Sequence, residues 1–240
     1  MGFGQSSQFP PCKGDLLMEK FNLIIFGPQG SGKGTQAKLL AKKFKMAIVA
    51  VGDLARKEAK AETSFGKKIR ELLRTGKLLP KEIVEGLIVK KLQKIPKNKI
   101  IFDGFPRNFE QVQILKKIIQ KFNLKEPIAI YLKIPRSVAI SRIASRKICS
   151  ECGQIFYPGT TDYEKGICSR CGQKIISRED DTKKAIENRL AIYYQETEPV
   201  ISFYRQQKRL IEINGRPKIE KVYQNILEKL NDYFKNSSGN

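Results

Sequence analysis

The stretch GPQGSGKGT at residues 27–35 follows an apolar run at 21–26 and precedes a helical pattern. Its glycines at 27, 30, 32 and 34 permit positive φ angles and a close approach of the backbone. Successive N–H groups and the N-terminus of the next helix can therefore surround phosphoryl oxygens, and Lys33 adds a positive charge. A buried strand before this loop and a helix after it predict a phosphate-binding loop in an α/β fold.

Length and composition fit one α/β core with small insertions, because the chain has 240 residues of which 40% are hydrophobic. The net charge of +22 favours polyanionic partners, either nucleic acid or nucleotide phosphates. The lysines recur along the whole chain, however, which is typical of a solvated basic surface. The chain contains no histidine, so acid–base chemistry near neutral pH has no default candidate.

Five short apolar runs, separated by helical stretches, predict the central sheet: residues 21–26, 47–51, 99–102, 128–132 and 210–213. The alternation of strands and helices predicts a P-loop, five-stranded parallel sheet flanked by helices. A closing helix with an apolar face over 219–230 is expected to dock on the sheet. The predicted core comprises residues 21–50, 80–147 and 178–235.

The two ends of the chain are expected to lie outside the fold, as a disordered extension over 1–20 and a disordered tail over 236–240. The extension contains a lone Cys12 and a second possible start at Met18. Met1-Gly2-x-x-x-Ser6 fits the myristoylation pattern, but the match is short and no strong polybasic segment follows. No signal peptide or membrane span is apparent, which predicts a cytoplasmic protein without a membrane partner.

Four cysteines occur in two Cys-x-x-Cys turns, Cys149 with Cys152 and Cys168 with Cys171, and a glycine follows each turn. Two such turns can bring four thiolates to one tetrahedral ion, and this closed set of ligands predicts a structural Zn²⁺ rather than a catalytic metal. Disulfide pairing is the alternative, which a cytoplasmic location disfavours. Zinc would stabilise an insert at 148–177 that is too small for its own hydrophobic core.

Polar motifs follow the second and third predicted strands, at the sheet edge where parallel α/β folds bind ligands. Gly52-Asp53-x-x-Arg56 comes first, with Asp53 expected to cap a helix. Residues 53–75 predict two short helices, a larger crossover than packing requires, so 51–79 is expected to form a movable flap. The second motif, Asp103-Gly-Phe-Pro-Arg107, has Gln111 four residues later.

Two pairs of arginines flank the cysteine segment. Arg142 and Arg146 are spaced to share a face of the helix that follows the fourth strand. Arg178 and Arg189 are separated by about three helical turns and share a face if their helix begins at Arg178. Asp180-Asp181 is expected to cap that helix and to position the arginines.

Together these motifs, from about residue 22 to 230, resemble the adenylate kinases. The loop is the narrower Gly-x-x-Gly-x-Gly-Lys-Gly-Thr variant, in which Gly34 separates Lys33 from Thr35. The cysteine insert is similar to the lid of zinc-containing members of that family. The resemblance therefore implies a helical insert for the nucleoside monophosphate and a small zinc-knuckle lid beside the core. It also implies the reaction ATP + AMP = 2 ADP.

The resemblance also implies a role for each motif residue. Asp103 would hold Mg²⁺ through water. The donor ATP would contact Gly30, Ser31, Gly32, Lys33, Gly34, Thr35, Arg142 and Arg146. The acceptor AMP would contact Val51, Arg56, Gly104, Arg107, Gln111, Arg178 and Arg189. Catalysis would depend on Lys33, Arg107, Arg142, Arg178 and Arg189.

No general base is needed for this reaction, because the acceptor is a phosphate oxygen that is already anionic at pH 7. Electrostatic stabilisation and alignment must supply the catalysis, and closure of the lid and flap would exclude water. The family is commonly monomeric, and no stable nucleic-acid partner is expected.

Three alternatives remain at this stage. A kinase acting on UMP or CMP shares most motifs but usually carries Asn at the position of Gln111. A family member that uses GTP instead of ATP as the donor is a second alternative, because no motif determines the donor base. A basic, zinc-knuckled nucleic-acid-binding ATPase would account for the charge, but it explains neither residues 103–107 nor the arginine spacing. Val51 departs from the family, which usually has Thr there, so the acceptor base stays open.

Overall fold

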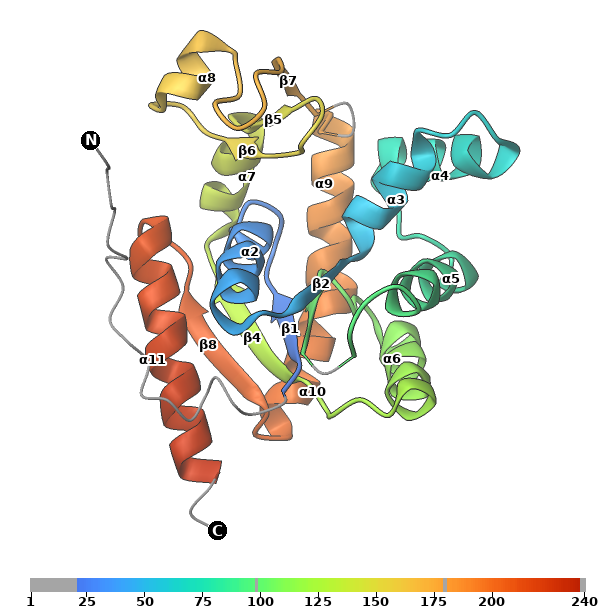
Figure 1. The fold of residues 1–240 in the computed structure, drawn as a ribbon, viewed down its shortest axis with the longest axis vertical. Coiled ribbons are helices and arrows are strands. Elements are labelled where there is room, and N and C mark those ends of the chain that lie inside the picture. Colours follow the sequence, from blue (N-terminus) through green and yellow to red (C-terminus); the bar gives the residue numbers. More distant parts are fainter. Residues whose placement is uncertain (1–20, 98, 179–180, 238–240) are drawn as a thin grey trace, which may run out of the picture.

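The computed structural model describes residues 21–97, 99–178 and 181–237, in which a five-stranded parallel sheet lies between helices (Figure 1). The strands are β1 (Leu23–Phe26), β2 (Ala47–Ala50), β3 (Ile100–Asp103), β4 (Ile128–Lys133) and β8 (Leu210–Asn214). Their order across the sheet is β2-β3-β1-β4-β8, and every pairing is parallel. The predicted α/β class and the five predicted strands are confirmed.

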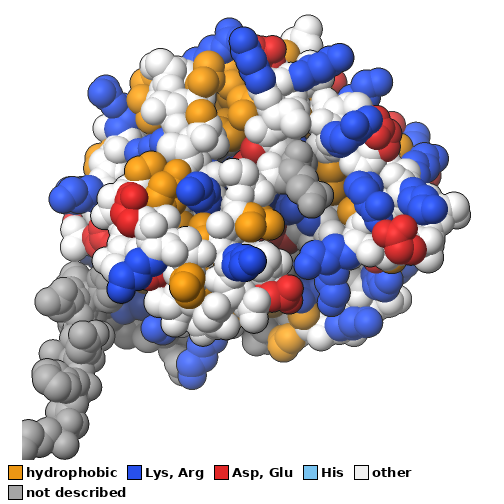
Figure 2. All heavy atoms as spheres, turned by 90° about the horizontal axis from the view of Figure 1, so that it is seen from above, with side chains coloured by type: hydrophobic (Ala, Val, Ile, Leu, Met, Phe, Trp, Pro, Cys, Tyr) orange, Lys and Arg blue, Asp and Glu red, His pale blue; other side chains and the backbone are white. Residues whose placement is uncertain are grey.

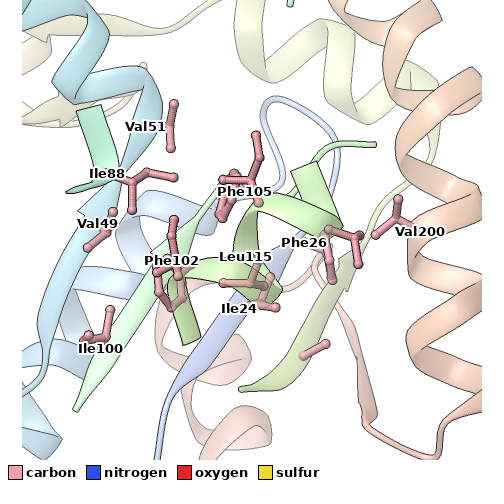
Figure 3. Packing of buried hydrophobic residues seen from close by; sticks show 14 of the residues in the cluster. Ile24, Phe26, Val49, Val51, Ile88, Ile100, Phe102, Phe105, Leu115 and Val200 are labelled. Atoms are coloured by element: carbon pink, nitrogen blue, oxygen red, sulfur yellow. The ribbon is translucent and has the colours of Figure 1, made fainter. Parts of the chain in front are cut away.

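Helices cover both faces of the sheet, which explains why the strands are continuous apolar runs. Side chains alternate along β1, so Leu23 and Ile25 pack under α2 (Lys33–Phe44) and α11 (Ile219–Ser237). Ile24 and Phe26 point to the other face (Figure 3). That face is covered by α5 (Lys81–Leu92), α6 (Phe109–Phe122) and α10 (Glu198–Gln206).

The segment between β2 and α5 contains α3 (Val51–Ala59) and α4 (Ser64–Thr75), the two helices predicted for the flap. Thr63 caps α4, because its hydroxyl accepts a hydrogen bond from the N–H of Gly66 at 3.0 Å. Asp53 does not cap α3 as expected. The helix begins at Val51, which places Asp53 within the first turn, where its carboxylate pairs with Arg56.

The cysteine insert forms a separate three-stranded antiparallel sheet in the order β6-β5-β7. Its elements are β5 (Lys147–Cys149), β6 (Ile155–Phe156), α8 (Thr161–Lys165) and β7 (Ile175–Ser177). Cys149, Phe156, Cys168 and Ile175 are its buried apolar residues. A core this small needs an additional cross-link, which a metal ion bound by the cysteines would provide.

The prediction that each pair of arginines shares one face of a helix is wrong for both pairs. The helix α7 (Arg136–Ala144) carries Arg142 but ends before Arg146, because the chain turns into β5. The helix α9 (Lys183–Ile192) starts well after Arg178 and continues through a π-helical turn, η1 (Tyr193–Thr197), into α10. Thr182, not Asp181, caps α9 by accepting from the N–H of Ala185 at 3.2 Å.

The expected extension at 1–20 lies outside the described residues, as do Asp180 and the tail residues 238–240. The tail prediction is wrong at its start, because α11 continues to Ser237. The limits proposed for core, flap and lid stay a prediction. Within the described part of the chain, no helix has the length and apolar character that crossing a bilayer requires.

Candidate active site

The glycine-rich loop connects β1 to α2 and is pressed against neighbouring backbone. Gly27, Gly30 and Gly32 have φ values of 147°, 79° and 92°. A Cβ atom at Gly27 would lie 2.7 Å from the carbonyl oxygen of Leu132, and one at Gly30 would lie 2.8 Å from that of Ala139. These contacts and angles require glycine at both positions. The close packing and the backbone angles explain why this loop is rich in glycine, and its role as an anion cradle stays a prediction.

Lys33 lies at the start of α2, and its ammonium group is bound to the loop itself. Nζ donates to the carbonyl oxygens of Gly27 at 2.7 Å and Pro28 at 2.9 Å. Burial lowers the pKa of Lys33 to about 8, and the cations of Arg107 and Arg146 act in the same direction against the opposing effect of Asp103. A phosphate at this position would restore the full charge of the amine.

Asp103, at the end of β3, faces the same loop. A Cβ on Gly34 would lie 3.3 Å from its Oδ2, so glycine allows this close approach. Burial raises the pKa of Asp103, although the charge of Lys33 opposes that shift. A carboxylate beside a phosphate loop is the oxygen ligand that Mg²⁺ prefers, so this residue fits the predicted role.

Arg107 is held in place by its own neighbourhood. Its Nε donates to the carbonyl oxygen of Gly104 at 3.0 Å, and its backbone N–H donates to Oε1 of Gln111 at 2.9 Å. Burial and the charge of Arg189 lower the pKa of Arg107 to about 10, which leaves it protonated at neutral pH. The amide oxygen of Gln111, a residue predicted to contact AMP, thus already accepts a hydrogen bond from Arg107.

Arg142 contacts backbone rather than another side chain. Its guanidinium donates to the carbonyl oxygens of Gly215 at 2.9 Å and Arg216 at 2.8 Å, with a longer contact to Gly30 at 3.4 Å. The side chain therefore bridges the phosphate loop and the segment after β8. Arg142 therefore lies at the loop, as predicted. Its contacts with the segment after β8 were not indicated by its position in the sequence.

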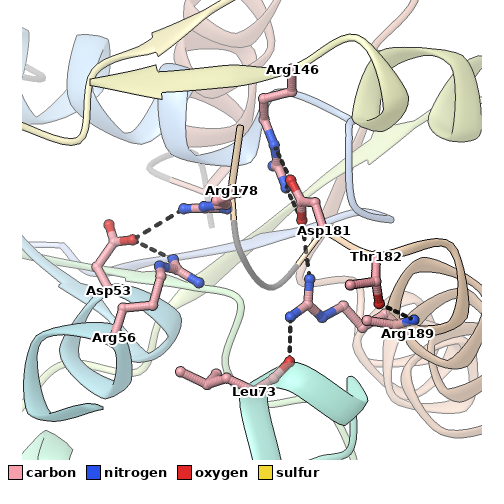
Figure 4. Close-up of polar contacts among 9 residues, drawn as sticks. Asp53, Arg56, Leu73, Arg146, Arg178, Asp181, Thr182 and Arg189 are labelled. Carbon is pink, nitrogen blue, oxygen red and sulfur yellow. Dashed lines mark hydrogen bonds and ion pairs between the residues drawn. The ribbon is translucent and has the colours of Figure 1, made fainter. Parts of the chain in front are cut away.

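Arg146 and Arg189 meet at a shared carboxylate, Asp181 (Figure 4). Arg146 binds it through two nitrogens, at 3.0 Å from Nε and 2.7 Å from one Nη. Arg189 reaches the same group at 3.2 Å and also donates to the carbonyl oxygen of Leu73 at 2.9 Å. Asp181 thus contacts Arg189, one of the two arginines that this acidic segment was expected to position, whereas the side chain of Arg178 lies near Asp53 instead.

A second carboxylate, Asp53, lies near Arg56 and Arg178 (Figure 4). Arg56 forms a hydrogen-bonded ion pair with it, and an Nη of Arg178 lies 3.8 Å from its Oδ1. Partial loss of hydration acts to raise the pKa of the exposed Asp53, but the charges of Arg56 and Arg178 outweigh this and hold the pKa below its ordinary value. The contact joins the first flap helix to the residue that follows β7.

Some of these groups line one cleft beside the glycine-rich loop. Its lining includes Lys33, Gly104, Arg107 and Arg189 from the predicted site, and Gly76 at the end of the flap. Val51 is buried in the hydrophobic cluster that also contains Ile88 and Phe105 (Figure 3). The structure thus brings donor-side and acceptor-side candidates together, while Val51 belongs to the core.

Two contacts that sequence reasoning missed attach the flap to α9. The side-chain amide of Asn188 donates to the carbonyl oxygen of Thr75 at 2.9 Å. A Cβ on Gly76 would lie 2.6 Å from the carbonyl oxygen of Ala185, so glycine is needed for this packing. The only available signal was the position of Asn188 beside Arg189 in the sequence.

The four cysteines of the insert converge as predicted. Their sulfur atoms lie within 4.8 Å of one another, and all four are free. The separations of 3.4 Å for Cys149 and Cys171 and 3.7 Å for Cys152 and Cys168 are much longer than a disulfide bond. Zn–S bonds of about 2.3 Å in a tetrahedron place sulfurs about 3.8 Å apart, so the set fits one zinc ion.

A doubly covered parallel sheet, a glycine-rich loop ending in lysine and arginines around one cleft define an enzyme that transfers phosphoryl groups. The adenylate kinase family model matches residues 25–209. The adenylate kinase of Pyrococcus furiosus is 36% identical over 216 residues, covering 90% of this chain and 97% of that protein. That of Phytoplasma australiense is 38% identical over 210 residues, covering 87% and 97%. The chain belongs to the adenylate kinase family and is a phosphotransferase.

Proposed function

We propose that this protein catalyses reversible, Mg²⁺-dependent transfer of the terminal phosphoryl group of ATP to AMP, giving two ADP. The observation that carries the proposal is the placement of Lys33, Arg107 and Arg189 around one cleft. Family membership and the relatives' activity support the same reaction. The alternatives of a UMP or CMP acceptor and of a GTP donor are decided by experiment below.

On the donor side, the backbone of residues 30–35 would hold the ATP phosphates at the N-terminus of α2. Lys33 would exchange the carbonyl oxygens of Gly27 and Pro28 for phosphoryl oxygens. Arg142 contacts the carbonyl oxygen of Gly30 in the loop, and Arg146 is held by Asp181. These residues bind and orient the transferred group, and their charges stabilise the charge that spreads over its oxygens.

On the acceptor side, Arg56 and Arg107 would hold the phosphate of AMP. Arg107 keeps its proton at neutral pH, because its pKa of about 10 remains well above 7. Its backbone is bonded to Gln111, which would place the remaining amide N–H groups of that residue toward the base. The acceptor oxygen is already ionised, so no side chain has to remove a proton.

Asp103 is the residue that would hold Mg²⁺, through water. Its carboxylate faces the phosphate loop at Gly34 and is electrostatically coupled to Lys33, so the donor chemistry fits a hard cation. When bound, Mg²⁺ neutralises charge on the phosphoryl oxygens. Burial raises the pKa of Asp103, and a bound cation beside it would favour the ionised carboxylate.

The cysteine cluster would hold a structural Zn²⁺. Four thiolate ligands leave no open position for a substrate, and the site lies in the insert rather than in the cleft. The lid and the flap would close over the two nucleotides and exclude water, the competing acceptor. We further propose a monomeric, cytoplasmic enzyme without a stable nucleic-acid or membrane partner.

The test is a coupled assay of ADP formation with purified protein, ATP and Mg²⁺, in which AMP, GMP, CMP and UMP are compared as acceptors and GTP as a donor. A strong preference for ATP and AMP is expected. Lys33→Ala and Arg107→Ala should lose most turnover while their circular dichroism spectra stay unchanged. Turnover with another monophosphate would refute AMP as the acceptor, and near-normal activity in either variant would refute that residue's role.

A further inference from the structure

The π-helical turn η1 (Tyr193–Thr197) interrupts the long helix formed by α9 and α10 beside the acceptor-side segment. Turns of this kind are rare and are often found at functional sites. Thr197 closes the turn, is buried and lines the cleft. Its hydroxyl donates to the carbonyl oxygen of Arg107 at 2.9 Å, across 90 positions of sequence.

The backbone of Arg107 is therefore fixed on both sides. Its N–H is bonded to Oε1 of Gln111 at 2.9 Å, and its carbonyl oxygen is bonded to Thr197. The direction of the guanidinium depends on this backbone, because among the described residues its side chain donates a hydrogen bond only to the nearby Gly104. Loss of either backbone bond would allow the segment to rotate and would move the guanidinium away from the acceptor phosphate.

Glu196, which precedes Thr197 in the same turn, binds Asn108, which follows Arg107 in the sequence. Oε2 of Glu196 accepts from the side-chain amide of Asn108 at 2.9 Å, and Oδ1 of Asn108 caps α6 through the N–H of Gln111 at 3.0 Å. Neighbours in an ordinary helix point in different directions. Two successive side chains of the turn, Glu196 and Thr197, nevertheless bind two successive residues of the opposite segment, Asn108 and Arg107.

We propose that Thr197 is a positioning residue, which acts on the acceptor phosphate through the backbone of Arg107. The inference rests on the proposed role of Arg107 in acceptor binding, and it adds a residue that the family motifs did not point to. Because Thr197 also lines the cleft, direct contact with the nucleotide is the competing explanation. The two explanations differ in whether the effect of a Thr197 substitution on AMP binding requires the side chain of Arg107.

The first experiment compares Thr197→Val, which removes the hydroxyl at nearly constant volume, with Thr197→Ser, which keeps it. Ser202→Ala is the matched control, because it removes a hydroxyl of the adjoining helix α10 whose hydrogen-bond partner is the side chain of Arg205. Thr197→Val should weaken AMP binding and raise the KM for AMP about tenfold, the factor for one hydrogen bond of about 1.4 kcal/mol. The KM for ATP should stay within about twofold, and Thr197→Ser should restore AMP binding.

The second experiment is a double-mutant cycle on the AMP dissociation constant, measured by calorimetry. In an Arg107→Ala background, Thr197→Val should cause no further loss, because the residue that it positions is gone. An equal tenfold loss in both backgrounds would overturn positioning and leave the role of Arg107 intact. An AMP dissociation constant of Thr197→Val equal to that of Ser202→Ala would also overturn the positioning role of Thr197. Wild-type affinity in Arg107→Ala alone would refute the proposed function of Arg107, and the positioning inference with it.

Discussion

Replacing Asp181 by Asn is expected to destabilise the protein strongly, because this carboxylate neutralises two arginines in a water-poor position. The exposed fractions of the side chains are 7% for Asp181, 9% for Arg146 and 11% for Arg189. Asn keeps the volume and one acceptor oxygen but removes the charge. Arg146, which binds Asp181 through two nitrogens, then loses its counter-charge while remaining buried.

The magnitude follows from the cost of leaving a buried charge without its partner, about 3–5 kcal/mol. For a chain of 240 residues, each kcal/mol shifts the midpoint of thermal unfolding by about 2–4 °C. Asp181→Asn should therefore lower the midpoint by about 6–20 °C. Part of this loss should be recovered with saturating ATP, whose phosphoryl oxygens would supply new partners for the same arginines.

The assay is thermal unfolding followed by circular dichroism, with Glu71→Gln as the matched control. Glu71 pairs with Arg74 at 3.1 Å, but their exposed fractions are 57% and 70%, so this pair is worth about 0.5 kcal/mol at most. The control should shift the midpoint by less than about 2 °C. Equal midpoints for the two variants would refute the argument that burial makes Asp181 important.

Three further outcomes are expected. Burial lowers the pKa of Lys33 to about 8, so the free protein loses this positive charge above that pH. The affinity for ATP should then decrease with rising pH, with a slope that approaches about tenfold per pH unit. Lys33→Arg should show no such decrease, because arginine stays protonated. Elemental analysis should find about one zinc per chain, and both a chelator and Cys171→Ser should release it and lower the unfolding midpoint; a metal-free wild-type protein with an unchanged midpoint would contradict the zinc site. Val51→Thr should cost about 1–3 kcal/mol of stability through an unpaired buried hydroxyl without changing the order of acceptor preference, and altered base selectivity would show that Val51 contacts the acceptor.

The central sheet and the phosphate loop could be predicted from local sequence because each depends on requirements that a few neighbouring residues satisfy. Strands covered on both faces must be apolar throughout, which made β1 and β4 visible as short runs. Positive φ angles and close backbone contacts at Gly27 and Gly30 leave no other residue type possible. The cysteine spacing is likewise a local pattern, and the four sulfurs that it predicts to meet lie within 4.8 Å of one another.

The arginine geometry could not be predicted in the same way. A spacing of i, i+4 places Arg142 and Arg146 on one face only while the helix lasts, and α7 ends between them. Asp181 and Thr182 are both good helix caps, and the choice between them was made by a tertiary contact, because Arg146 binds the aspartate. The bond from Thr197 to Arg107 joins residues 90 positions apart and has no local pattern at all.

The structure also bears on how the site distinguishes its ligands, because each of its cations already has an internal oxygen partner. Lys33, Arg107 and Arg142 bind backbone carbonyl oxygens, whereas the remaining arginines share Asp53 and Asp181. Phosphate binding is then an exchange of oxygen partners, and its free energy is a difference between two similar interactions. A free phosphate ion, which replaces few of these partners, should gain little. Two nucleotides in line would replace several partners at once, so we expect the complete pair of substrates to bind more favourably than either fragment alone.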